Sequence, residues 1–201
     1  MNQLLINFKE SKTLNELTEI LDSGWQTYKS NALLYSSFTL GFSLLLWALS
    51  IIPFASGLLT PFFLASFYTA IIKSKTKKEI TIYDFIAIPK EKFNLIFISG
   101  SLSSLITFFG FILFILPGLY FFASYLFVMP LTLEKQNDKS SAWEILEESR
   151  KIFTNNYKII TAAVFVYIAL ALLGALALGL GLFITIPLIT CINYQLYKKI
   201  K

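Results

Sequence analysis

The residues best suited to hold a ligand are two prolines, each followed by a tyrosine and a lysine at the same intervals. The matching sets are Pro61, Tyr68 and Lys73, and Pro187, Tyr194 and Lys199. A proline inside a helix removes one backbone hydrogen bond and kinks the axis. In transporters, interrupted helices at matching places in two repeats mark the solute site. The spacing favours a tolerated kink at each proline, with a helix break that forms a solute site as the alternative.

The neighbours of the prolines extend this predicted site. Thr60 directly precedes Pro61 and suits the capping position of a helix that begins at that proline. The predicted helix-break or solute site consists of Thr60, Pro61, Tyr68, Thr185, Pro187 and Tyr194.

Catalytic and metal-binding chemistry finds few suitable side chains. The chain has no histidine, which removes the commonest general base and the commonest metal ligand. Its single cysteine, Cys191, lies in an apolar run, and all 12 Asp and Glu residues lie in polar connections. We therefore expect a protein that is not an enzyme and that has no metal and no cofactor.

The composition indicates a membrane protein. Of the 201 residues, 56% are hydrophobic and only 14% are charged. Soluble domains carry about 25% charged residues, so lipid is the solvent that fits this chain. We expect one polytopic membrane domain over residues 1–201, and we expect the first apolar segment to be a retained anchor because no signal peptide precedes it.

Apolar segments and charged connections alternate along the chain. The six apolar segments are 32–52, 54–72, 93–115, 118–133, 159–178 and 182–197, and a span needs about 20 residues. All 17 Lys and Arg residues lie in residues 1–31, 73–92 and 133–158 and in the tail, whereas the turns within each segment pair are uncharged. By the positive-inside rule, the sequence predicts six transmembrane helices as three hairpins in the inner membrane, with both termini cytoplasmic.

One phrase occurs twice in front of a hairpin. "EILDSGWQTYKSN" begins at Glu19 and "EILEESRKIFTNN" begins at Glu144. Capping-box spacing predicts that the two amphipathic helices begin at Thr13 and Ser141. Small residues, Gly24 and Ser149, fall on the apolar face of each helix, where they predict close helix packing or lipid contact.

The phrase and the proline sets together predict an internal repeat. The units are 13–73 and 141–199, with a weaker third copy at 79–133. Chance resemblance between amphipathic helices is the alternative. The predicted fold is thus all-α, with two or three cytoplasmic interfacial helices added to the spans.

Two further polar patterns have a simple interpretation and a functional one. The basic run Lys73, Lys75, Lys77 and Lys78 fixes topology, and it also suits anionic lipid headgroups, whereas nucleic-acid binding is not expected. Ser99, Ser103 and Thr107 share one face of the third segment. They predict close helix packing, with the lining of a polar pathway as the alternative.

Three stretches resemble a known group of proteins. They are "GWQTYKSN", "LPGLYFFASYLFVMPL" and "AWEILEESRKIFTNNYKI" followed by "GLGLFITIPL". The chain is similar in pattern to bacterial six-helix membrane proteins of unassigned activity, related to the membrane domain fused to some glycerophosphodiester phosphodiesterases. The resemblance implies a six-helix fold with a membrane-associated role and no defined activity.

The sequence favours a non-enzymatic membrane scaffold or accessory protein. Its cytoplasmic helices are expected to meet lipid headgroups or a membrane-protein partner. The alternative is a transporter or channel for a small or lipid-like solute with a midplane site near the prolines.

Overall fold

A computed structural model describes residues 2–49, 55–76, 79–135 and 140–201, and for residues 2–12 and 55–58 it describes the backbone alone. Within these ranges the chain is helical and contains no strand. The helices are α1 (Asn2–Lys29), α2 (Ala32–Ala48), α3 (Ala55–Ser74), α4 (Ile82–Ile86), the short 3-10 helix η2 (Lys90–Lys92), α5 (Phe93–Leu113), α6 (Ile115–Ser124), α7 (Val128–Glu134), α8 (Ala142–Asn155), α9 (Tyr157–Leu176) and α10 (Leu182–Ile200).

Each predicted apolar segment contains a helix, but not every helix has the length and composition of a span. Among the described residues, three stretches pass both criteria: Lys90–Leu113, Ile115–Glu134 and Tyr157–Leu176. A fourth candidate is Thr13–Lys29 with Ala32–Ala48, a pair bent by 81°. These criteria give three or four spans, fewer than the six predicted. The helix α2 has 17 residues, and α10 ends in a polar stretch that lowers its hydropathy.

The amphipathic helices in front of the hairpins form, with one error in the prediction. The helix α8 begins as expected, with Ser141 Oγ accepting from the Glu144 amide at 3.2 Å and the Glu144 carboxylate accepting from the Ser141 amide at 3.0 Å. The predicted helix start at Thr13 is wrong, because α1 runs unbroken from Asn2. No glycine or proline lies upstream of Thr13 to stop it.

Both copies of the repeated phrase end at a similar backbone break. Asn31 has φ −142° and ψ 35°, and Asn156 has φ −124° and ψ 26°. Each asparagine separates the amphipathic helix from the apolar helix that follows it.

The prediction that Pro61 and Pro187 break their helices is wrong. The helices α3 and α10 continue through both prolines, so Thr60 lies inside α3 and caps no new helix. Close packing supports α3 here, since a Cβ added to Gly100 of α5 would lie 2.4 Å from the Cβ of Pro61. The interruption falls instead at 125–127, between α6 and α7.

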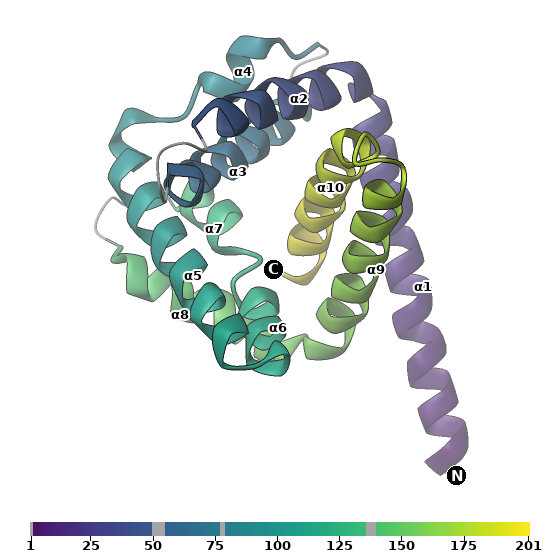
Figure 1. Ribbon diagram of the computed structural model, residues 1–201. Coiled ribbons are helices and arrows are strands. Elements are labelled where there is room, and N and C mark those ends of the chain that lie inside the picture. Colours follow the sequence, from purple (N-terminus) through teal and green to yellow (C-terminus); the bar gives the residue numbers. More distant parts are fainter. Residues whose placement is uncertain (1, 50–54, 77–78, 136–139) are drawn as a thin grey trace.

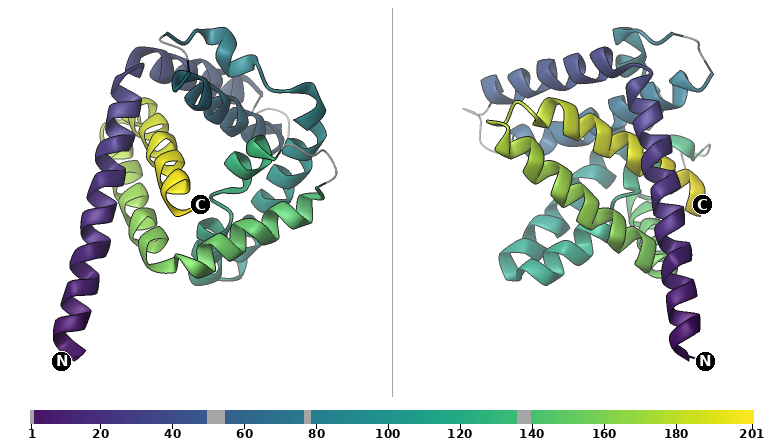
Figure 2. Two further views of the ribbon diagram at one scale, coloured as in Figure 1. Left: turned by 180° about the vertical axis from the view of Figure 1, so that it is seen from behind. Right: turned by 90° about the vertical axis from the view of Figure 1, so that its right-hand side faces the viewer.

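The helices are arranged around a ring (Figure 1). We call the helices in front of the three hairpins the leading helices; they are α1, α4 and α8. Each packs on the second part of another hairpin: α1 on α10, α4 on α3, and α8 on α6 and α7. The N-terminal half of α1 extends beyond the other helices (Figure 2).

Charged residues from all the long connections meet around the C-terminal ends of α3, α7 and α10. Three lysines form ion pairs with acidic residues of the leading helices. The pairs are Lys73–Asp84 at 3.3 Å, Lys135–Glu148 at 2.9 Å and Lys199–Glu19 at 2.5 Å. Glu134 accepts hydrogen bonds from Tyr197 and Lys201. Exposed apolar side chains gather elsewhere, at residues 105–116 and 172–180. This division into polar and apolar surfaces is compatible with a bilayer.

Candidate functional site

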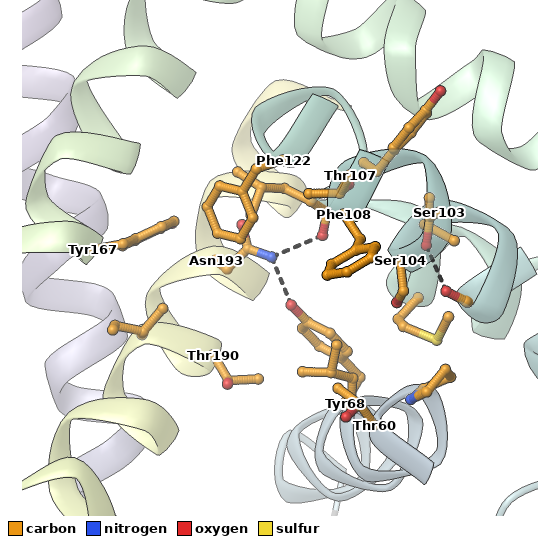
Figure 3. A pocket seen from close by; sticks show the side chains of 18 of the residues that line it. Thr60, Tyr68, Ser103, Ser104, Thr107, Phe108, Phe122, Tyr167, Thr190 and Asn193 are labelled. Atoms are coloured by element: carbon orange, nitrogen blue, oxygen red, sulfur yellow. Dashed lines mark hydrogen bonds between the residues drawn. The ribbon is translucent and has the colours of Figure 1, made fainter. Parts of the chain in front are cut away.

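A pocket of about 440 Å³ lies between the helices of all three hairpins. Its walls come from α3, α5, α6, α7, α9 and α10, together with the interruption at 125–127. The polar side chains in its lining are those of Thr60, Tyr68, Ser103, Ser104, Thr107, Tyr125, Tyr167, Thr190 and Asn193 (Figure 3). None of the described residues that line it is Asp, Glu, Lys or Arg.

Asn193 organises the polar end of the pocket. Its Nδ2 donates to the hydroxyl of Tyr68 at 2.6 Å and to the carbonyl of Leu126 at 3.1 Å (Figure 3). In a continuous helix the Leu126 carbonyl would accept a hydrogen bond from the backbone amide four residues later. That residue is Pro130, which has no amide hydrogen. The asparagine side chain therefore replaces a missing backbone donor, as an apolar environment demands.

A second side chain donates a hydrogen bond to a backbone carbonyl next to the interruption at 125–127. Ser149 of α8 is fully buried, and its Oγ donates to the carbonyl of Ser124 at 2.6 Å. Gly24 makes the equivalent close contact in α1, where an added Cβ would lie 2.5 Å from Ile192 Cγ1. Both small residues thus lie at close packing contacts between a leading helix and another hairpin, as the sequence predicts.

Two residues that line the pocket each have a buried polar atom with no hydrogen-bond partner within the part of the chain that the structure describes. The atoms are Oδ1 of Asn193 and the hydroxyl of Tyr167. The two residues are only 4% and 3% exposed. Each atom has less than 1 Å² of accessible surface, so a hydrogen-bond partner reaches it only after neighbouring side chains move. An unpaired buried polar atom costs about 1–3 kcal/mol, which favours a ligand that pairs with these atoms.

Three phenylalanine side chains form the exposed part of the pocket lining. Phe108 and Phe111 of α5 and Phe122 of α6 line it and are substantially exposed. The pocket therefore has a polar inner end, formed by Asn193, Tyr68 and Tyr167, and an apolar opening. We call this opening the phenylalanine mouth.

The structure brings together about half of the predicted solute site. Thr60, Pro61 and Tyr68 line the pocket. Thr185 lies beside Gly174 at the far end of α10, and Pro187 is buried outside the pocket lining. Tyr194 also lies outside it, with its ring centroid 6.2 Å from that of Tyr68.

The two described lysines of the basic run, Lys73 and Lys75, both contact other side chains. Lys73 pairs with Asp84, and Lys75 donates to the amide oxygen of Gln195 at 3.3 Å and lies 4.7 Å from the centroid of the Tyr194 ring. Partial burial and the neighbouring Lys198 charge lower the pKa of Lys75. Lys77 and Lys78 lie outside the described residues.

The serine and threonine stripe of the third segment divides between a helix contact and the pocket lining, and the predicted polar pathway stays a prediction. Ser99 is buried and lies 3.3 Å from Thr132 Oγ1, which is close helix packing. Ser103 and Thr107, one and two turns further along α5, line the pocket. Sequence reasoning missed Asn193 and Tyr167. The available signals were Asn193 itself, one of two amide side chains in the apolar segment 182–197, and Pro130 in the fourth segment.

The described residues contain no group of three or more His, Cys, Asp and Glu side chains that could hold a metal ion. No protein-family model, curated protein or solved structure matches this chain. The resemblance to the six-helix membrane group therefore stays a prediction.

Proposed function

We propose that this protein is a non-enzymatic integral membrane protein of six spans, in three hairpins, with both termini on the cytoplasmic side of a bacterial inner membrane. The gathering of charged residues from every long connection at one end of the molecule supports this topology. So does the uncharged turn between α9 and α10, where Leu178 is 92% exposed.

Topology is tested with single cysteines in a Cys191→Ala background. Leu178→Cys is expected to react with an impermeant thiol reagent in whole cells, and Lys158→Cys only after the cells are opened. Labelling of Lys158→Cys in intact cells contradicts the topology.

We further propose that the three units are related by a pseudo-threefold axis along the membrane normal. The three leading helices each pack on another unit in cyclic order, which supports the proposal. So do the ion pairs Lys73–Asp84, Lys135–Glu148 and Lys199–Glu19, each of which joins the end of one unit to the start of the next. The pocket lies where the three units meet, which is the usual place for a transporter's site.

The function that the geometry supports best is binding of a solute in this pocket, for its movement across or out of the bilayer. The observation that carries the proposal is the pair of unpartnered polar atoms, Asn193 Oδ1 and the Tyr167 hydroxyl, in a pocket between apolar helices. Polar side chains inside membrane segments are rare and mark solute pathways. Pro61 serves as part of the pocket wall and not as a helix break.

Cysteine accessibility tests whether the pocket opens to a solute. In the Cys191→Ala background, Ser103→Cys is expected to react with small thiol reagents in proteoliposomes. The matched control is Ala163→Cys on α9, which is fully buried and lies outside the pocket lining, and which is expected to stay unreactive. A Ser103→Cys variant as unreactive as the control removes the proposal.

A scaffold role for the leading helices is the second candidate. Exposed tryptophans on α1 and α8, Trp25 and Trp143, favour it, because tryptophan concentrates at membrane interfaces. In a Trp47→Phe background, lipids brominated near the headgroup are expected to quench the fluorescence of both. An absence of quenching would show that Trp25 and Trp143 do not contact the lipid headgroups. The surfaces around them would then be left for a protein partner.

A further inference from the structure

We propose that the pocket takes an uncharged lipid with hydroxyl and carbonyl groups in its head region, of the diacylglycerol class. This inference rests on the proposed solute-binding function and names the chemical class of the solute. It is argued from the charge, the hydrogen-bonding groups and the shape of the pocket.

The absence of charge in the lining selects an uncharged ligand. No described residue of the lining is acidic or basic. Arg150 and Glu147 of α8 act on the lining residue Tyr125, but they pair with each other at 2.7 Å. A buried charge without a partner is among the costliest groups in a protein, and more so between apolar helices. A phosphate-bearing or ammonium-bearing head group would find no counter-ion among the described residues that line the pocket, and it could engage Arg150 or Glu147 only by breaking their ion pair.

The two unpartnered atoms select the polar groups of the ligand. Asn193 Oδ1 can only accept, so it needs a donor such as a hydroxyl. The Tyr167 hydroxyl can donate, so it suits an ester or other carbonyl oxygen. The Nδ2 of Asn193 is already used by Tyr68 and Leu126, which fixes the orientation of the amide and leaves Oδ1 for the ligand. A diacylglycerol carries one hydroxyl beside two ester carbonyls.

The shape of the pocket selects an amphiphile over a compact polar solute. A volume of about 440 Å³ is within the usual range for ligand sites of about 300–1,000 Å³. The phenylalanine mouth is formed by exposed side chains of α5 and α6, on the surface that faces lipid in the proposed topology. A polar head near the buried Asn193 and Tyr167, with acyl chains leaving past the exposed phenylalanine mouth, uses both parts of the lining.

The test uses the full chain in lipid nanodiscs and two photoreactive lipids with the same chains. One is a diacylglycerol with a diazirine near the head region, and the other is the corresponding phosphatidic acid. The diacylglycerol is expected to crosslink to α5 and α6 at the phenylalanine mouth, and unlabelled diacylglycerol is expected to compete. The phosphatidic acid is expected to give only the background labelling of lipid-facing surfaces.

Tyr167→Phe is the decisive variant because it removes only an atom without a protein partner. Thermal stability is expected to be unchanged or slightly higher, whereas diacylglycerol affinity is expected to fall about 3- to 10-fold, the effect of one hydrogen bond. Tyr157→Phe on the same helix is the control, since Tyr157 is exposed and lies outside the pocket lining; it is expected to bind like the parent. Asn193→Leu is the weaker test, because Asn193 also supports the break at Leu126.

The outcomes separate this inference from the proposed function. Equal crosslinking of phosphatidic acid, or equal affinity in Tyr167→Phe and the parent, overturns the ligand class and leaves the pocket. If neither lipid binds while Ser103→Cys reacts with thiol reagents, the pocket serves a water-soluble solute and the inference is wrong. If neither lipid binds and Ser103→Cys is inert, both the inference and the proposed function are wrong.

Discussion

Gly24→Ala is expected to destabilise the protein, although alanine is the better helix former. The new Cβ would lie 2.5 Å from Cγ1 and 2.7 Å from Cα of Ile192, so the backbone of α10 itself must move. Overpacking of this kind costs about 1–3 kcal/mol. A backbone collision places the cost near the upper end, and the gain in helix propensity is about 1 kcal/mol. The net loss is therefore about 2 kcal/mol.

Gly41→Ala is the matched control. Gly41 lies inside α2, and nothing described lies within 4 Å of an added Cβ there. This variant keeps the propensity gain of about 1 kcal/mol without the collision. For a domain of this size, 1 kcal/mol corresponds to about 2–4 °C in Tm. We therefore expect thermal unfolding in detergent to shift down by about 4–8 °C for Gly24→Ala and up by about 2–4 °C for Gly41→Ala.

The comparison refutes the reasoning if both variants become more stable by a similar amount. In that case α1 does not pack against α10 through Gly24. The proposed cyclic packing of the leading helices then loses one of its three contacts.

Two further predictions follow from the polar contacts. Ser149→Ala leaves the Ser124 carbonyl without its donor and is expected to lower the free energy of unfolding by about 1–3 kcal/mol. Ser101→Ala is the control, because it removes a buried hydroxyl without a described partner. It is expected to be neutral or stabilising in the same thermal assay. Because burial and then Lys198 lower the pKa of Lys75, the protonated form is less favourable in the folded state, and stability should rise as pH increases through this lowered value. Acetylation of Lys75 in the folded protein is thus expected to reach its half-maximal rate below the ordinary lysine pKa of about 10.4, and an ordinary or higher value contradicts the burial described for it.

The sequence predicts the helices well because hydrophobic periodicity and capping signals are local. Ser141 starts α8 through contacts only three residues away, and Asn31 and Asn156 end the two phrases in the same way. Thr13 has the same capping spacing, but the helix that precedes it has no residue to stop it. A cap signal is therefore reliable only where the upstream segment is not itself helical.

The break in the fourth segment could not be placed from local sequence alone. Pro61, Pro130 and Pro187 look alike in the sequence, yet only the segment of Pro130 is interrupted. The interruption depends on Asn193 and Ser149, which reach its carbonyls from 67 and 25 residues away in sequence. The same distance hides the pocket, because its polar end is assembled from α3, α9 and α10 only after the hairpins pack.

A structure of the protein in lipid nanodiscs tests lipid binding in the pocket most directly. We expect density for an uncharged lipid, with its head within hydrogen-bonding distance of Asn193 Oδ1 and the Tyr167 hydroxyl and its chains leaving through the phenylalanine mouth. A collapsed, dry pocket in which Asn193 Oδ1 and the Tyr167 hydroxyl are paired with other protein groups would contradict it.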